Sequence, residues 1–194
     1  MSISSSTKSR ATTVQRETQP VTLSERSLVG IAFVRVFVGY LWFQQLFWKL
    51  PPDFAGLYKY IVRESHNALI PGYGALLSHT FLAGCASPVS PAGCTLFVPL
   101  AAGVWTAELL VAISLMFGLF TRFGAILSCI LAAQLYFGLA YADWYWQYGM
   151  LILLGLALVA IPAGRRFGID QWLSPRLRDA RDHSRLARIA AWFV

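Results

Sequence analysis

Four long apolar stretches, separated by polar segments, dominate the pattern of this chain. They cover Ser27–Leu50, Leu96–Phe120, Phe123–Tyr141 and Tyr145–Ala163. Each is close to the roughly 20 residues that a helix needs to cross the hydrocarbon core of a bilayer. The turns after the second and third stretches are so short that neighbouring helices must run antiparallel. The pattern therefore predicts an all-α membrane protein built on an antiparallel four-helix transmembrane bundle.

The segments around this bundle have patterns of their own. Residues 1–26 are rich in Ser, Thr and charge and lack periodicity, which is typical of a disordered tail. Residues 27–173 hold the bundle with its loop 51–95, where apolar positions at helical spacing over Phe54–Ser65 predict a short outer-face helix. Residues 174–194 begin with Ser-Pro, a helix-start signal, and mix arginines with large apolar residues. They predict a basic amphipathic helix lying on anionic lipid, with a solvated tail as the alternative.

Composition and charge agree with a membrane location and give it a direction. Hydrophobic residues make up 57% of the chain and charged residues only 13%, against about 25% charged in soluble domains. The net charge of +7 lies at the edges of the apolar stretches, which argues against a nucleic-acid partner and for the positive-inside rule. Both termini are then cytoplasmic and loop 51–95 lies outside. We expect a multi-pass protein of a bacterial or archaeal cytoplasmic membrane.

A few polar side chains interrupt the predicted spans. An ionisable group in hydrocarbon costs at least about 2.5–3.5 kcal/mol and rarely faces lipid. Arg35 and Glu108 lie at similar depths on neighbouring spans, so we expect them to form a buried ion pair. That pair is either structural or a functional proton relay. Gln44, Gln45 and Gln134 either continue a polar track toward the outer face or hold the helices together.

The outer ends of the spans combine a lysine with many aromatic residues. Lys49 ends the first span beside Trp48, and Trp105 and Trp144 are expected at the same level. One interpretation is an aromatic belt at the membrane interface with a lysine that reaches water. The other is a flat apolar slot for a quinone head group, with Lys49 or Gln44 donating a hydrogen bond to a quinone carbonyl.

The cysteines and histidines limit the cofactors that the chain can hold. Cys85 and Cys94 share the outer loop, where the oxidising environment permits a structural disulfide; a redox-active pair is the weaker alternative because the spacing is not that of a CxxC motif. Cys129 lies in the third span as a packing residue. The three histidines are scattered, so we expect no metal or haem site.

Short sequence pieces, in order along the first span to residue 173, resemble the DoxX/DoxD superfamily of small membrane proteins. The pieces are Arg35 with Gly39, Trp48-Lys49, Glu108 followed by Leu115, Gly118, Leu119, Thr121 and Arg122, then Trp144-Tyr145-Trp146, and last the GRRFGID stretch at 164–170. The WYW and GRRFGID pieces are similar to the DoxD side of the group. The resemblance implies the small membrane subunit of a thiosulfate:quinone oxidoreductase.

Three functions are compatible with these features. The first is a membrane subunit of a quinone-linked oxidoreductase complex, in which a partner subunit on the outer face oxidises thiosulfate or a related sulfur donor. Glu108 and Arg35 would relay protons there, and Lys49 with the outer aromatic residues would contact quinone. The second is a non-catalytic scaffold or assembly subunit of a larger membrane complex. A small-solute transporter is the third; it predicts spans broken by Gly or Pro at mid-membrane, and only Pro99, near one end of its span, comes close.

Overall fold

The computed structural model describes residues 25–87, 89–142, 144–180 and 184–194. Over these residues the chain is all-helical and has no strand. The α-helices are α1 (Glu25–Gln45), α2 (Ala55–Asn67), α3 (Tyr73–His79), α4 (Phe97–Phe117), α5 (Thr121–Gly138), α6 (Trp146–Ala160), α7 (Asp170–Ala180) and α8 (Arg185–Phe193), and a 3₁₀ turn, η1 (Ala163–Arg165), precedes α7. The predicted tail 1–26 lies outside the described residues except for its last two, which begin α1.

Three of these helices are long and apolar enough to cross a membrane. They are α1 over Arg26–Gln45, α4 and α5. The next helix, α6, is also apolar but has 15 residues, which correspond to about 22 Å of helix at about 1.5 Å per residue. The chain is therefore a helical protein with three candidate membrane spans and a shorter apolar helix after them.

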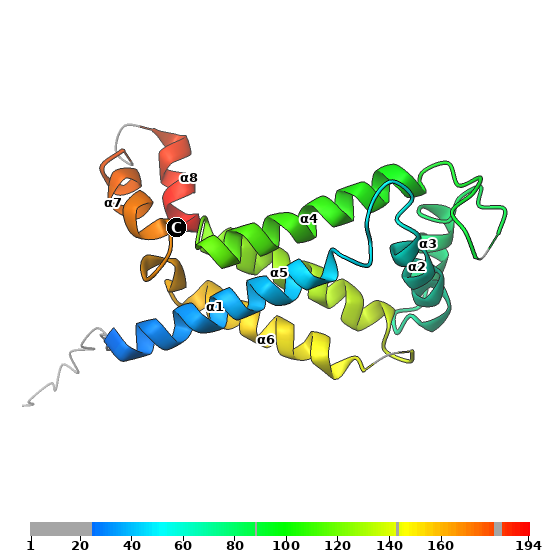
Figure 1. The fold of residues 1–194 in the computed structure, drawn as a ribbon, viewed down its shortest axis with the longest axis horizontal. Coiled ribbons are helices and arrows are strands. Elements are labelled where there is room, and N and C mark those ends of the chain that lie inside the picture. The colour runs from blue at the N-terminus through cyan, green and yellow to red at the C-terminus, as the bar shows by residue number, and fades with distance from the viewer. Residues whose placement is uncertain (1–24, 88, 143, 181–183) are drawn as a thin grey trace, which may run out of the picture.

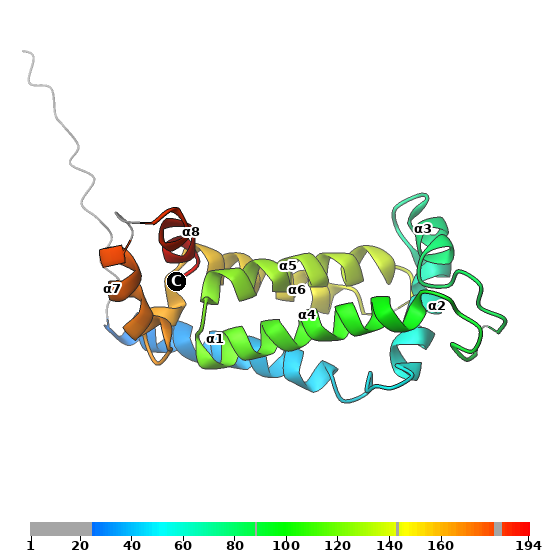
Figure 2. The same ribbon diagram turned by 90° about the horizontal axis from the view of Figure 1, so that it is seen from above.

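The four apolar helices lie side by side. Helix α1 packs against α4, α4 against α5 and α5 against α6, and α6 also contacts α1. Between them lies a core of small and large apolar residues that includes Val38, Trp42, Val111 and Leu115. The indole Nε1 of Trp42 donates a 2.7 Å hydrogen bond to the Ser128 hydroxyl inside this core. Helices α2 and α3 cover one end and α7 and α8 the other (Figures 1 and 2), and we call these the α2/α3 end and the α7/α8 end.

The α2/α3 end has a second apolar core. Leu57, Tyr58 and Ile61 of α2 pack with Leu77 of α3 and Phe97 at the start of α4. The sequence predicts one short helix over Phe54–Ser65, and the structure has α2 there, with α3 as an addition that the sequence did not predict. The predicted disulfide is confirmed, because the sulfur atoms of Cys85 and Cys94 are 2.02 Å apart.

Two predicted boundaries are wrong. The first predicted span runs to Leu50, whereas α1 ends at Gln45 and a turn follows it. The predicted C-terminal helix starts at Ser174, whereas α7 starts at Asp170, contains Pro175 and is followed by the separate helix α8. Helix α7 starts early because the backbone N–H of Asp170 donates a 2.8 Å hydrogen bond to the Gly118 carbonyl of the α4–α5 turn.

Candidate functional site

A cavity of about 250 Å³ lies at the α2/α3 end, where the turn after α1 meets α2, α3, α4 and α5. Much of its wall is apolar, as expected of a small-molecule site. Polar side chains from five different parts of the chain interrupt that wall, and they include Lys49, Glu64, Tyr73, Glu108 and Gln134. Such a gathering of ionisable groups around a cavity is the strongest candidate for a functional site in the described part of the chain.

Lys49 and Glu108 form an ion pair in this wall. The Lys49 ammonium contacts Oε1 of Glu108, and each residue is only 2% exposed. The other carboxylate oxygen of Glu108, Oε2, is buried without a hydrogen-bond partner among the described atoms. The predicted Arg35–Glu108 pair is therefore wrong. Helix α1 ends at Gln45, and the turn that follows brings Lys49 to Glu108. The prediction compared depths along straight helices and so did not include this turn.

Glu64 is a member of this site that the sequence did not single out. It lies on α2, is 1% exposed, and accepts a 2.5 Å hydrogen bond from Gln134 Nε2 and a 3.5 Å one from the Tyr73 hydroxyl. Gln134 Nε2 also donates to the Tyr73 hydroxyl at 2.9 Å. The buried side of α2 includes Leu57, Ile61 and Glu64, which follow one another at helical spacing. A carboxyl group at such a position on an apolar helix face is the sequence signal that could have indicated its burial.

The charges of the cavity do not balance when every group is ionised. One lysine faces two carboxyl groups, and Glu108 makes the direct contact with that lysine. Burial raises the pKa of Glu64 to about 8, although Lys49, Tyr73 and Gln134 act in the opposite direction. Burial and the nearby Glu64 likewise raise the pKa of Tyr73 to about 12. At neutral pH Glu64 therefore holds a proton beside the Lys49–Glu108 pair, as expected for a carboxyl group buried in a low-dielectric site.

A crevice on the side of the helices adjoins this cavity. It has a volume of about 330 Å³ and lies between α1 and α6, with Trp42, Trp146 and Tyr148 in its wall. Tyr60 and Leu135 line both the crevice and the cavity. These two side chains therefore lie between the crevice and the cavity.

The other predicted site residues lie in different places. Trp48 lines the cavity, with the Lys49 ammonium 4.6 Å from its ring centre and the Tyr60 ring 4.5 Å away. Trp105 does not line it and points its Nε1 toward the Leu46 carbonyl at 3.4 Å. Gln44 and Trp144 are not in the lining either: Gln44 donates to the Tyr40 hydroxyl at 2.6 Å, and Trp144 is 70% exposed with its ring near that of Trp146.

Arg35 lies at the α7/α8 end, far along α1 from the cavity residues. Its guanidinium donates hydrogen bonds of 3.0 Å to the Ala163 carbonyl and 2.8 Å to the Phe167 carbonyl. Nearby, the carboxylate of Asp170 accepts hydrogen bonds from the backbone N–H groups of Phe120 and Thr121 at 2.8 and 2.9 Å. The segment Gly118–Arg122 and the GRRFGID stretch at 164–170 thus meet, and Arg35 and Asp170 join them by hydrogen bonds. We call this arrangement the Arg35 clasp, and it gives Arg35 a structural role.

The remaining candidates add no metal site. Cys129 lies half-buried in α5 with its Sγ 3.6 Å from the Ile152 carbonyl, and Cys85 and Cys94 are consumed by their disulfide. Within the described ranges, no group of three or more His, Cys, Asp or Glu side chains has an arrangement that could hold a metal ion. The cavity residues themselves offer hydrogen bonding, charge and proton exchange.

Comparison with known proteins does not place the chain in a group. No family model matches it, and no curated protein and no solved structure matches it either. The functional argument therefore depends on the cavity itself.

Proposed function

We propose that this chain is the membrane subunit of a quinone-linked oxidoreductase of the DoxX/DoxD type, and that it binds the quinone head group in the cavity at the α2/α3 end. The observation that carries the proposal is the wall of this cavity, in which the buried groups of Lys49, Glu64 and Glu108 face a space of about 250 Å³. The ring of Trp48 in the same wall offers a flat aromatic surface on which a quinone ring can stack.

The polar groups suit the proton balance of quinone reduction. Each quinone takes up two electrons and two protons to become a quinol. The Lys49 ammonium is a hydrogen-bond donor for a quinone carbonyl, and Glu64, whose pKa is raised to about 8, holds a proton at neutral pH that it can give to one reduced oxygen. The second proton comes from water at the outer face. The electrons come from a partner subunit that oxidises a reduced sulfur donor such as thiosulfate, two of which release two electrons when they join through an S–S bond.

The crevice between α1 and α6 supports access from the bilayer. Its walls are largely apolar and aromatic, and it meets the cavity at Tyr60 and Leu135. A quinone with a long apolar tail would leave its tail in this crevice and place only its head group among the charges. A cavity closed to the side would favour a small water-soluble ligand instead.

The proposal includes a topology. Helix α6 crosses as a fourth, short span, supported by its packing against α5 and α1. The arginine-rich segment 164–194 places the α7/α8 end in the cytoplasm by the positive-inside rule. The α2/α3 end, with its disulfide between Cys85 and Cys94, is then outside, where disulfides persist. Both termini are cytoplasmic, and the sulfur-oxidising partner docks on the outer face.

A pair of variants on α4 tests the binding site. Val104 lines the cavity, whereas Val98 on the same helix is exposed and does not. Val104→Phe should fill the space and lower the affinity for a short-tailed quinone by roughly tenfold or more, measured by quenching of tryptophan fluorescence in the purified full chain. Val98→Phe makes the same chemical change elsewhere and should leave the affinity unchanged. Equal affinities for wild type and Val104→Phe would contradict the proposed site.

A scaffold subunit is the second candidate, and one observation favours it. The Arg35 clasp holds α1 near its middle, and the Lys49–Glu108 pair holds the turn that follows it, which an assembly subunit also needs. The test is donor-dependent quinone reduction in membranes that contain the chain with its partners. Lys49→Met should lower turnover strongly while the complex still assembles. Unchanged turnover in an assembled complex would favour the scaffold.

A further inference from the structure

The α7/α8 end has a polar hollow of its own between η1 and α7. Its volume is about 300 Å³, and Arg165, Gln171, Ser174 and Arg178 supply donors to its wall, with Asp179 as the acidic member. Helix α7, which lines this hollow, lies at the opposite end of the helices from α2 and α3, which line the proposed quinone site (Figure 1). Neither quinone binding nor a scaffold role for α1 involves it.

Positive charge accumulates at this hollow without enough negative charge to balance it. Burial and the neighbouring guanidinium groups of Arg178 and Arg122 lower the pKa of Arg165, and Asp170 is the acid that opposes this effect. Both carboxylate oxygens of Asp170 already accept backbone hydrogen bonds. Among the described residues, the lysine–glutamate pair of the cavity is the one ion pair found, so no described carboxylate lies at ion-pair distance from Arg165, Arg178 or Arg122.

We propose that this hollow binds the phosphate of an anionic phospholipid head group. Guanidinium groups match the oxygens of a phosphate with paired hydrogen bonds, and basic pockets at the cytoplasmic ends of membrane helices are suited to anionic lipid. Gln171 and the Ser174 hydroxyl supply neutral donors in the same wall.

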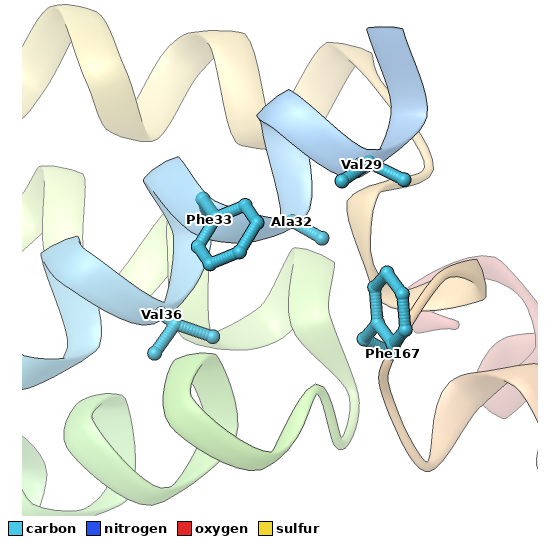
Figure 3. Close-up of a pocket in the computed structure, with 5 residues that line it drawn as sticks. All are labelled: Val29, Ala32, Phe33, Val36 and Phe167. Atoms are coloured by element: carbon cyan, nitrogen blue, oxygen red, sulfur yellow. The ribbon is translucent and has the colours of Figure 1, made fainter. Parts of the chain in front are cut away.

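The surroundings favour a lipid over a soluble phosphate. Trp172, next to Gln171, is 71% exposed, and tryptophan is enriched at membrane interfaces. An apolar groove of about 290 Å³ also lies at this end, between α1 and Phe167, and no polar side chain lines it. Figure 3 shows Phe167 facing Val29 and Ala32 across this groove. Because Arg165 and Phe167 belong to one short segment, a lipid can place its phosphate in the hollow and an acyl chain along the groove.

Two double variants with equal charge changes test this site. Arg165→Gln with Arg178→Gln removes the two arginines of the hollow, whereas Arg176→Gln with Arg188→Gln removes two exposed arginines of α7 and α8 that do not line it. Retention of phosphatidylglycerol by the purified full chain, measured by native mass spectrometry against phosphatidylcholine, should fall by roughly tenfold or more in the first double variant, as expected for lost charge-assisted hydrogen bonds. The second should retain the lipid as wild type does.

Other outcomes overturn the proposal. An equal loss in both double variants would show a general effect of net charge rather than a site. Equal retention of the two lipids by wild type, with binding of inorganic phosphate in thermal-shift titrations, would show a site for soluble phosphate. If the first double variant fails to fold, Gln171→Glu places a negative charge in the hollow without removing an arginine. It should weaken phosphatidylglycerol binding, and wild-type retention would refute the site.

Discussion

The protonation of Glu64 makes a sharp prediction about stability. Its folded pKa of about 8 lies above the ordinary value of 4.5, so the folded chain keeps a proton that the unfolded chain releases between these values. The free energy of unfolding should therefore fall as the pH rises from about 4.5 to about 8. Below this window Glu64 is protonated in both the folded and the unfolded chain. Above it Glu64 is ionised in both, and the loss of unfolding free energy has reached its full size.

The size of the effect follows from the same values. A change of one pKa unit corresponds to about 1.4 kcal/mol. The rise in the pKa of Glu64 from 4.5 to about 8 therefore lowers the free energy of unfolding by about 5 kcal/mol at most. Glu64→Gln resembles the protonated carboxyl group and cannot ionise. This variant should lose the pH slope, match wild type near pH 5 and be the more stable protein at pH 9.

The assay is thermal unfolding of the full chain in detergent, followed by tryptophan fluorescence between pH 5 and pH 9. The matched control is Asp179→Asn, which removes an exposed carboxyl group at the opposite end and should keep the wild-type slope. If Glu64→Gln retains the slope of wild type, the carboxyl group of Glu64 is not the one that holds the proton. That result would also remove the proton source from the proposed mechanism.

Three further predictions concern the framework. Gly118→Ala should cost about 1–3 kcal/mol, because Gly118 has φ +63° and a Cβ there would overlap the Arg35 guanidinium, whereas Gly103→Ala in open space should be neutral or slightly stabilising in the same thermal assay. Lys49→Met should cost about 3–5 kcal/mol by leaving Glu108 buried and unpaired; adding Glu108→Leu should recover much of this loss, and additive losses in the double-mutant cycle would refute the pairing. Replacing both cysteines of the loop disulfide by serine should cost about 2–3 kcal/mol, and an unchanged unfolding midpoint would show that the bond does not stabilise the fold.

The sequence pieces that resemble the DoxX/DoxD superfamily were identified from the sequence, but their contacts were not. Arg35, Gly118 and the GRRFGID stretch stand out in the sequence, where the depth of the spans places Arg35 beside Glu108. In the fold they form a clasp at the α7/α8 end, where Gly168 and Gly164 also approach Arg35 and Asp170 closely. These residues are far apart in the sequence, and the contacts between them are made only when the chain returns from η1 to the α4–α5 turn.

The apolar pattern of the chain by itself determined an all-helical protein with membrane-spanning helices, a helix near 54–65 and a disulfide in the loop before α4. These features depend on local hydrophobicity, helical spacing and nearby cysteines, all of which involve residues that are close together in the sequence. The partner of Glu108 was decided by tertiary structure, because it depends on where α1 ends and how the next turn folds back with Lys49. The same holds for Glu64, whose burial and protonation arise only when α2 packs over α5 and brings Gln134 within hydrogen-bond distance.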